Sequence, residues 1–485
     1  MRDRERDRGS ERRRLKELRR AWRMRSSRRE TVEVAYVVYV VAVMGLLVVA
    51  PAVAVVFEAL NTPTVLDALG SSSAPATAAL VVGLAWAMAL WVGAGYGPIT
   101  IAPALVGLWA GTDLPRRAGL RRTFRQRAAW ATTAWVGAGT LVGGILLADG
   151  GAPHESALLV LAAAAVGAIG SVAWLAGQSF ARHAWWLGAT VAALTVLAAA
   201  WPPARWLAVV GAAAALVVPR LLDALRGPDL LAQALRWQSA TTTAGSGDLQ
   251  TALGSLRALP RRGRRWRAVV EGPTAMRFAV ADLVGTWRTT GRFVIGALAL
   301  TASAAVLAAA VAQPLGPALA AGGAVLAYLA LGVFCDGLRH AAALAARPGL
   351  FGFGPWRLFA LHSTAPFVIT ALAGVAGWAL VAASGRVTHA LALALGLVSV
   401  LVVRAWGAAK GQLPVSLLTP IPTPMGDLSA LNVAAWLADA PLVAALAGGG
   451  VVWLLADGRA TDAVVGAAIL VVLLLRSLRR RVDRL

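Results

Sequence analysis

Several ingredients of common protein chemistry are scarce in this chain of 485 residues. Its single cysteine, Cys335, excludes a disulfide framework and a multi-cysteine metal site. Of its two lysines, Lys16 lies in RRRLKEL and Lys410 in GAAKGQL, so neither completes the G-x-x-x-x-G-K-[ST] pattern of an ATP-binding P-loop. The five histidines are scattered, without metal-ligand spacing. We therefore expect no cofactor, no metal and no catalytic residue, and the chain is not expected to be an enzyme.

Charge is scarce too, and apolar residues take its place. Only 14% of the residues are charged, whereas soluble domains average about 25%. Hydrophobic residues make up 58% of the chain, and the mean hydropathy is +0.68. Apolar runs of about twenty residues recur along it, which is typical of membrane-spanning helices. The sequence thus predicts an all-α polytopic membrane protein with about 12 transmembrane helices, over residues 34–58, 76–96, 128–148, 157–178, 184–201, 204–222, 293–312, 315–335, 358–382, 388–404, 433–455 and 462–476.

The basic residues predict the orientation of these spans. With the N-terminus inside, 43 of the 46 Lys and Arg residues fall on the cytoplasmic side, and only Arg205, Arg386 and Arg459 fall outside. This asymmetry follows the positive-inside rule, so we expect both termini to be cytoplasmic. The same rule accounts for the net charge of +23 without nucleic acid as a partner. The basic run RRGRRWR, residues 261–267, is expected to contact anionic membrane lipids.

The spans divide into two six-helix halves with the same layout. In each half, two spans precede a basic inside segment and four more spans follow it, an arrangement that suits transporters built from repeats. The predicted parts are a basic cytoplasmic tail (1–30), the first membrane half (31–222), a cytoplasmic basic linker with short helices (223–291), the second membrane half (292–477) and a basic cytoplasmic tail (478–485).

The first basic inside segment, TDLPRRAGLRRTFRQR at residues 112–127, has the features of a contact surface. Pro115 can start a helix, and Leu120 and Phe124 then lie four residues apart on one face. The flanking arginines can reach lipid phosphates or pair with acidic residues of a partner. The alternative is that the arginines only fix the topology.

Two other features allow two interpretations each. Asp439 is the deepest carboxylate in the spans, and it either has a function within the membrane or lies near the cytoplasmic interface. The prolines of TPIPTPMGD, residues 419–427, favour extended geometry. This segment is either a stiff connector or a second contact surface.

Two transporter families share patterns with the chain. GTDLPRRAGLRR has the Gly, Asp and Arg residues of the loop motif of the major facilitator superfamily, but Leu114 and Pro115 separate Asp113 from its arginine. Four other stretches, in order, resemble type 2 ATP-binding-cassette (ABC) exporter permeases, especially large ones from high-GC Gram-positive bacteria. These are GYGPITIAPALVGLWAGTDLPRRAGLRRTF, MRFAVADLVGTWRTTGRFV, GLRHAAALAARPGLFGFGPWRLFALHSTAP and GQLPVSLLTPIPTPMGDLSALNVAAWLADAP.

The second resemblance implies a permease subunit in the plasma membrane that is driven by a separate cytosolic ABC ATPase. It places the ATPase-coupling segment after the second span, at Pro115, Arg116, Arg117, Leu120, Arg121, Arg122 and Phe124. Possible second contacts are Arg339, Arg347, Arg357, Pro420, Pro422 and Pro424. The alternatives are a secondary transporter of the major-facilitator type and a membrane scaffold that transports nothing.

The charge asymmetry predicts which loops are accessible from outside. In a variant whose Cys335 is replaced by alanine, cysteines at Ser72, Gly151 and Ala460 should react with a membrane-impermeant maleimide on intact cells. Cysteines at Ala118, Ser246 and Gly411 should react only after permeabilisation. Opposite labelling at any two of the six positions would overturn the twelve-span topology.

Overall fold

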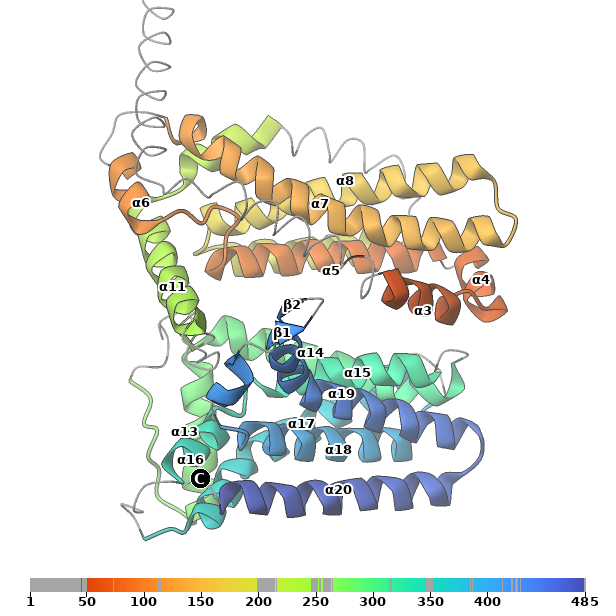
Figure 1. The fold of residues 1–485 in the computed structure, drawn as a ribbon, viewed down its shortest axis with the longest axis vertical. Helices are drawn as coiled ribbons and strands as arrows, with labels where there is room; N and C mark the ends of the chain where they lie inside the picture. Colours follow the sequence, from red (N-terminus) through yellow and green to blue (C-terminus); the bar gives the residue numbers. More distant parts are fainter. Residues whose placement is uncertain are drawn as a thin grey trace, which may run out of the picture. The chain divides into compact units, whose positions relative to one another are not determined.

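The protein is almost entirely α-helical in the computed structural model (Figure 1). The structure describes residue 45 and most of residues 50–483. The positions it does not describe are 1–44, 46–49, 73, 111–114, 199–213, 215, 246–251, 253, 256–262, 264, 314–315, 346–351, 384, 386, 412, 420–421, 424–425, 428 and 484–485. The chain divides into two compact units, residues 1–239 and 240–485, and the division falls within the predicted linker.

The helices of the first unit begin with two short ones and continue with long apolar ones. They are α3 (Ala50–Leu60), α4 (Pro63–Gly70), α5 (Ala74–Gly95), α6 (Pro103–Ala110), α7 (Arg116–Ala148), α8 (Pro153–Ser179) and α9 (Ala184–Ala198), followed by helical residues 216–224. The next helix, α11 (Gly227–Gly245), begins with Gly-Pro-Asp, which puts a proline in its first turn, and continues across the division between the units.

The second unit contains eight α-helices among its described residues. They are α13 (Thr274–Trp287), α14 (Thr290–Ala309), α15 (Gly316–Leu331), α16 (Asp336–Leu344), α17 (Pro355–Ala383), α18 (Ala390–Ala408), α19 (Ser429–Ala456) and α20 (Ala460–Val482). Short 3-10 helices, η2 (Ala310–Ala312) and η3 (Val415–Leu418), follow α14 and α18. In Figure 1, α13 and α16 lie at the end of this unit where the chain terminates.

Eight of the described helices are long and apolar enough to cross a membrane, and a ninth results if α15 and α16 form one bent span. The eight agree with the predicted spans 76–96, 128–148, 157–178, 293–312, 358–382, 388–404, 433–455 and 462–476. The predicted spans 34–58 and 204–222 lie largely outside the described residues, and α9 covers the described part, residues 184–198, of the predicted span 184–201. The chain is therefore an all-α polytopic membrane protein.

The predicted span 315–335 differs most from the structure. Helix α15 ends at Leu331, and after three residues and Cys335 the chain continues as α16, at an angle of 66° to α15. Gly332, Val333 and Phe334 close turns on the carbonyls of the last residues of α15. Hydropathy averages over such a break because the residues on both sides of it are apolar.

The two units repeat the same order of elements. An apolar helix of 22 or 16 residues (α5 or α15) is followed by a helix of 8 or 9 residues (α6 or α16) and then by a helix of 33 or 29 residues (α7 or α17). Moreover, α5 packs against α8 and α9, and α15 packs against the corresponding α18 and α19. The repeat of layout that the sequence suggests is thus also a repeat of packing.

Segment 422–427, predicted as part of an extended connector, contains the only strands in the described part of the chain. Pro422–Thr423 (β1) and Gly426–Asp427 (β2) form a two-residue antiparallel pair, with Pro422 opposite Asp427. The connector therefore reverses its direction before α19 begins at Ser429. A purely extended connector would not do so.

Helix α5 crosses α8 at a point where both helices lack a side chain. A Cβ atom on Gly177 would lie 2.0 Å from the carbonyl oxygen of Leu90, and one on Gly93 would lie 2.2 Å from that of Trp174. These neighbours are backbone atoms, which cannot rotate away. The close approach therefore requires glycine, as is common where helices pack within membranes.

This crossing generates a stability prediction. Gly177→Ala should force α5 and α8 apart and destabilise the protein by about 1–3 kcal/mol, the usual cost of overpacking. The midpoint of thermal unfolding in detergent should fall. Gly137→Ala in α7 is the matched control, because a Cβ there has no neighbour within 4 Å. Equal midpoints for the two variants would contradict the close crossing.

Candidate functional site

The first turns of α7 contain the predicted contact segment, and their apolar side is buried. The helix begins at Arg116, with Pro115 as its N-cap residue, as the sequence predicted. Leu120 and Phe124 are only 2% and 6% exposed. They pack in a cluster with Ile99, Val106, Leu175, Leu221, Leu222, Leu225, Leu230 and Ala234. These two side chains thus anchor the helix in its own unit, so a partner cannot bind to them directly.

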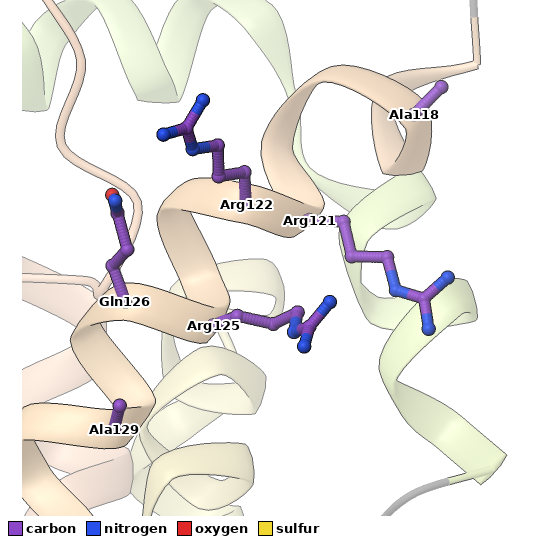
Figure 2. A pocket seen from close by; sticks show the side chains of 6 residues that line it. All are labelled: Ala118, Arg121, Arg122, Arg125, Gln126 and Ala129. Atoms are coloured by element: carbon purple, nitrogen blue, oxygen red, sulfur yellow. The ribbon is translucent and has the colours of Figure 1, made fainter.

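The opposite side of the same turns is exposed and basic. Arg121, Arg122 and Arg125 line a shallow groove of about 640 Å³, together with Ala118, Gln126 and Ala129 (Figure 2). In Figure 2, Arg121 and Arg125 extend to one side of the helix, and Arg122 and Gln126 extend to the other. Among the described residues, no carboxylate lies within salt-bridge distance of these three arginines. The groove is therefore electropositive and free to take an anionic group.

A carboxylate caps the N-terminus of this helix. The backbone N–H of Arg117 donates to Oδ1 of Asp223 (3.0 Å), and Nε of Arg117 lies 3.6 Å from Oδ2. Asp223 belongs to the helical residues 216–224. An acceptor at the first turn satisfies a free N–H group and complements the helix dipole. Sequence reasoning missed this contact, because 106 residues separate its partners.

The non-helical segment between α5 and α6 is held by a buried glutamine. The side-chain amide of Gln178 donates to the carbonyl of Ile99 (2.9 Å), and its oxygen accepts the Ile99 N–H (3.1 Å). The same amide donates to Oε1 of Gln233 in α11 (2.7 Å). A Cβ on Gly97 would overlap the Gln178 side chain, so glycine is needed at this position. This network fixes the chain that leads into α6 and α7.

In the second unit, the corresponding short helix α16 is held by ion pairs. Asp336, its first residue, binds Nη1 of Arg292 (2.6 Å) and Nη1 of Arg339 (3.1 Å). Beside it, Nδ1 of His362 and Oδ2 of Asp282 form a hydrogen bond of 2.8 Å. Both of these groups lie against Gly337, where a Cβ would come within 2.3 Å of each. Sequence reasoning missed the contact between His362 and Asp282, since neither residue lies in a recognisable motif.

The predicted second contacts are dispersed. Arg339 is engaged with Asp336, and Arg357 at the start of α17 lies over the ring of Phe353 at 4.8 Å. Pro422 lies in β1. Arg347, Pro420 and Pro424 lie outside the described residues. Of the six predicted second contacts, only Arg339 and Arg357 are charged residues that the structure describes.

Asp439 lies beside the end of α18. Its Oδ2 lies 2.6 Å from Nζ of Lys410, whose side chain is 10% exposed. Lys410 also donates to the backbone carbonyl of Trp436, and its Nζ atom lies 4.0 Å from the centre of the Trp436 ring. Burial lowers the pKa of Lys410, and the adjacent Asp439 carboxylate opposes that change. Because Lys410 follows the last residue of α18, this ion pair lies near the end of the span.

No group of three or more His, Cys, Asp and Glu side chains that could hold a metal ion occurs in the described part of the chain. Comparison of the chain with protein-family models, with curated proteins and with solved structures finds no match. The fold thus defines an all-α polytopic membrane protein, and its activity has to be argued from its own residues.

The two sides of α7 predict opposite effects on stability. Leu120→Ala should lower the midpoint of thermal unfolding, because it removes a buried side chain at a cost of about 2–5 kcal/mol. Arg121→Gln, one residue further along and on the exposed side, should leave the midpoint unchanged. If the two variants unfold at the same temperature, Leu120 is not part of the core.

Proposed function

We propose that the chain is the membrane-spanning permease subunit of an ABC-type exporter. It would move a substrate across the plasma membrane, using ATP that a separate cytosolic subunit hydrolyses. The proposal includes twelve spans in two halves, with both termini in the cytoplasm. The order of the four family-like stretches supports it, as does the absence of a P-loop from the sequence.

The observation that carries this proposal is the two-sided start of α7. The helix has 33 residues, whereas crossing the hydrocarbon core takes about 20. The twelve residues before the predicted span 128–148 extend it by about 18 Å. One side of this extension is buried against its own unit, and the other presents arginines that no described carboxylate pairs with. Movement of a partner bound to the arginines would therefore move the span as well, because α7 is one continuous helix.

The chemistry of the groove indicates an acidic partner surface. Arginine forms two parallel hydrogen bonds with one carboxylate, so Arg121, Arg122 and Arg125 can together take several Asp or Glu side chains. Among the described residues no carboxylate pairs with them, so docking would break none of the ion pairs that the structure describes. The corresponding region of the second unit, around Arg339 and Arg357, is the proposed second contact.

An ion-driven secondary transporter is the other candidate, and the Lys410–Asp439 pair favours it. Such transporters use ionisable groups within their spans, and Asp439 lies ten residues into α19. Its pairing with a lysine beside the end of α18 makes a structural role equally consistent with the geometry. We therefore propose the ATPase-driven mechanism first.

The decisive experiment tests whether this chain, purified from its own membrane, captures a cytosolic ABC ATPase of the same cell. Arg121→Gln/Arg122→Gln should reduce capture several-fold at low salt and make the remaining capture less dependent on salt. Arg479→Gln/Arg480→Gln, near the exposed end of α20, removes the same charge elsewhere and should retain full capture. The amount of protein in the membrane is measured in parallel.

Two results would contradict the coupling role of α7. Unchanged capture by the Arg121/Arg122 variant would leave these arginines with topology alone as their role. Equal loss in both double variants would mean that capture depends on overall charge. Failure of the wild-type chain to capture any ABC ATPase would leave the ion-driven alternative.

A further inference from the structure

One charged side chain is enclosed within the second unit without a matching acid. Arg404 lies in α18, four residues before the helix ends at Ala408, and the residue is only 8% exposed. Its Nε atom is buried and has no hydrogen-bond partner. Arginine keeps its proton at all physiological pH values, so this group cannot become neutral as a buried lysine or histidine can.

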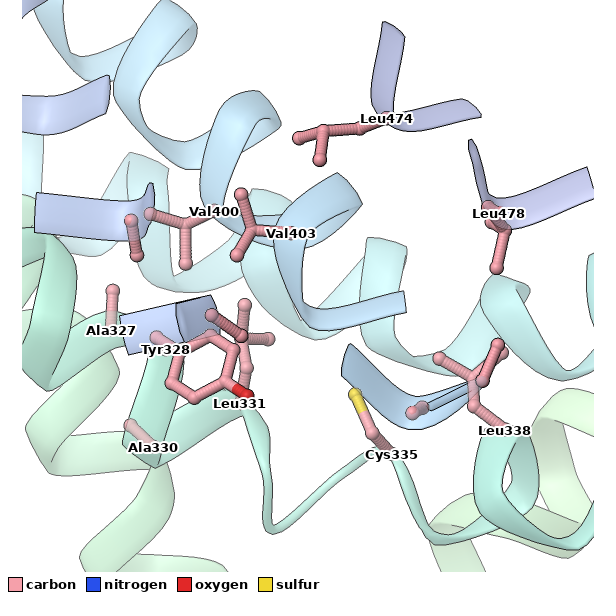
Figure 3. Close-up of a cluster of buried hydrophobic side chains, with 14 of the residues drawn as sticks. Ala327, Tyr328, Ala330, Leu331, Cys335, Leu338, Val400, Val403, Leu474 and Leu478 are labelled. Atoms are coloured by element: carbon pink, nitrogen blue, oxygen red, sulfur yellow. The ribbon is translucent and has the colours of Figure 1, made fainter. Parts of the chain in front are cut away.

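The guanidinium lies beside the bend between α15 and α16. Its central carbon is 4.7 Å from the ring centre of Tyr328. A Cβ on Gly332, the first residue of the bend, would lie 2.7 Å from its Nη2 atom. Cys335, fully buried at the start of α16, lies close enough to interact with the same charge. Figure 3 shows Tyr328 and Cys335 in the surrounding apolar cluster.

The neighbouring charges leave Arg404 uncompensated. Asp336, across the bend, already binds both Arg292 and Arg339. No carboxylate among the described residues lies within 4.0 Å of the Arg404 nitrogens. The carbonyl end of α15 at Leu331 offsets part of the charge, since a helix C-terminus carries about half a negative charge. An unpaired cation in such surroundings is costly, and in a membrane span it marks a functional site.

We propose that Arg404 is the binding site for an oxyanion of the phosphate type, held at the bend of the α15–α16 span. Two guanidinium N–H groups can grip two oxygens of one phosphate. The guanidinium lies over the Tyr328 ring, and the lack of a side chain at Gly332 lets it lie directly against the bend. The phosphate belongs either to a phospholipid headgroup or to a solute. This site is independent of the proposed function.

The test uses the purified full chain in nanodiscs of phosphatidylcholine, which has no net charge. One arm adds inorganic phosphate in place of chloride at constant ionic strength. A second arm replaces part of the phosphatidylcholine with anionic phosphatidylglycerol. A bound ligand stabilises the folded state, so at least one arm should raise the wild-type midpoint of thermal unfolding by about 2–4 °C. The arm that does so identifies the source of the phosphate.

Substitutions then assign that shift to Arg404. Arg404→Met should abolish it and, without added anion, should unfold at a higher temperature than the wild type, because the unpaired charge is gone. Arg480→Gln, an exposed arginine of α20, should keep the full shift. If Arg404→Met does not fold, Arg404→Lys replaces it and should show at most half the shift, because an ammonium cannot form the paired bonds.

The proposal is overturned if neither arm stabilises the wild type. It is overturned equally if Arg404→Met, or Arg404→Lys in its place, shows the wild-type shift. Neither result tests the proposed binding of an ATPase, because the capture experiment depends on the Arg121 and Arg122 surface of α7 and not on Arg404.

Discussion

The constraint on which the whole structure depends is that a backbone N–H or C=O group in lipid must find its partner within the protein. Long helices satisfy this requirement by themselves, and the two breaks in helical structure show how it is met elsewhere. After α5, the side chain of Gln178 bonds both backbone groups of Ile99. After α15, Nη2 of Arg292 donates to the carbonyl of Gly332 (3.1 Å). In each unit, then, a polar side chain from another helix bonds the backbone groups that lie where the helical hydrogen bonds end.

Each unit also places a helix N-terminus beside a carboxylate from elsewhere in the chain, at α7 in the first unit and at α16 in the second. Asp223 accepts the N–H of Arg117 at the start of α7, and Asp282 lies against Gly337 in the first turn of α16. Both carboxylates come from segments outside the repeated set of helices. Each unit therefore fastens the start of a helix with an acid supplied by a connecting segment.

The sequence predicts the features that arise from composition and local order. The apolar runs locate the eight long helices, Pro115 marks the start of α7, and the four-residue spacing of Leu120 and Phe124 places them on one side. The packing partners of that side could not be predicted from the sequence, because Leu221, Leu222 and Leu225 lie about a hundred residues away along the chain. An apolar stripe looks the same whether a partner or the chain itself covers it. The break after Leu331 was also missed, since both of its sides are apolar.

The arginines of the chain fall into physically distinct groups that composition alone cannot separate. Arg292 and Arg339 have a carboxylate partner and hold α16 in place. Arg121 and Arg122 are exposed and have no carboxylate partner among the described residues, so water and salt screen them and a partner can engage them at little cost. Arg404 is buried and has no carboxylate partner in the described part of the chain, so only the Tyr328 ring and the end of α15 offset its charge. An exposed free charge needs only the positive-inside rule to explain it, whereas a buried one needs a counter-ion. For this reason Arg404, the one arginine classed as buried among the described residues, carries more information about binding than the exposed ones.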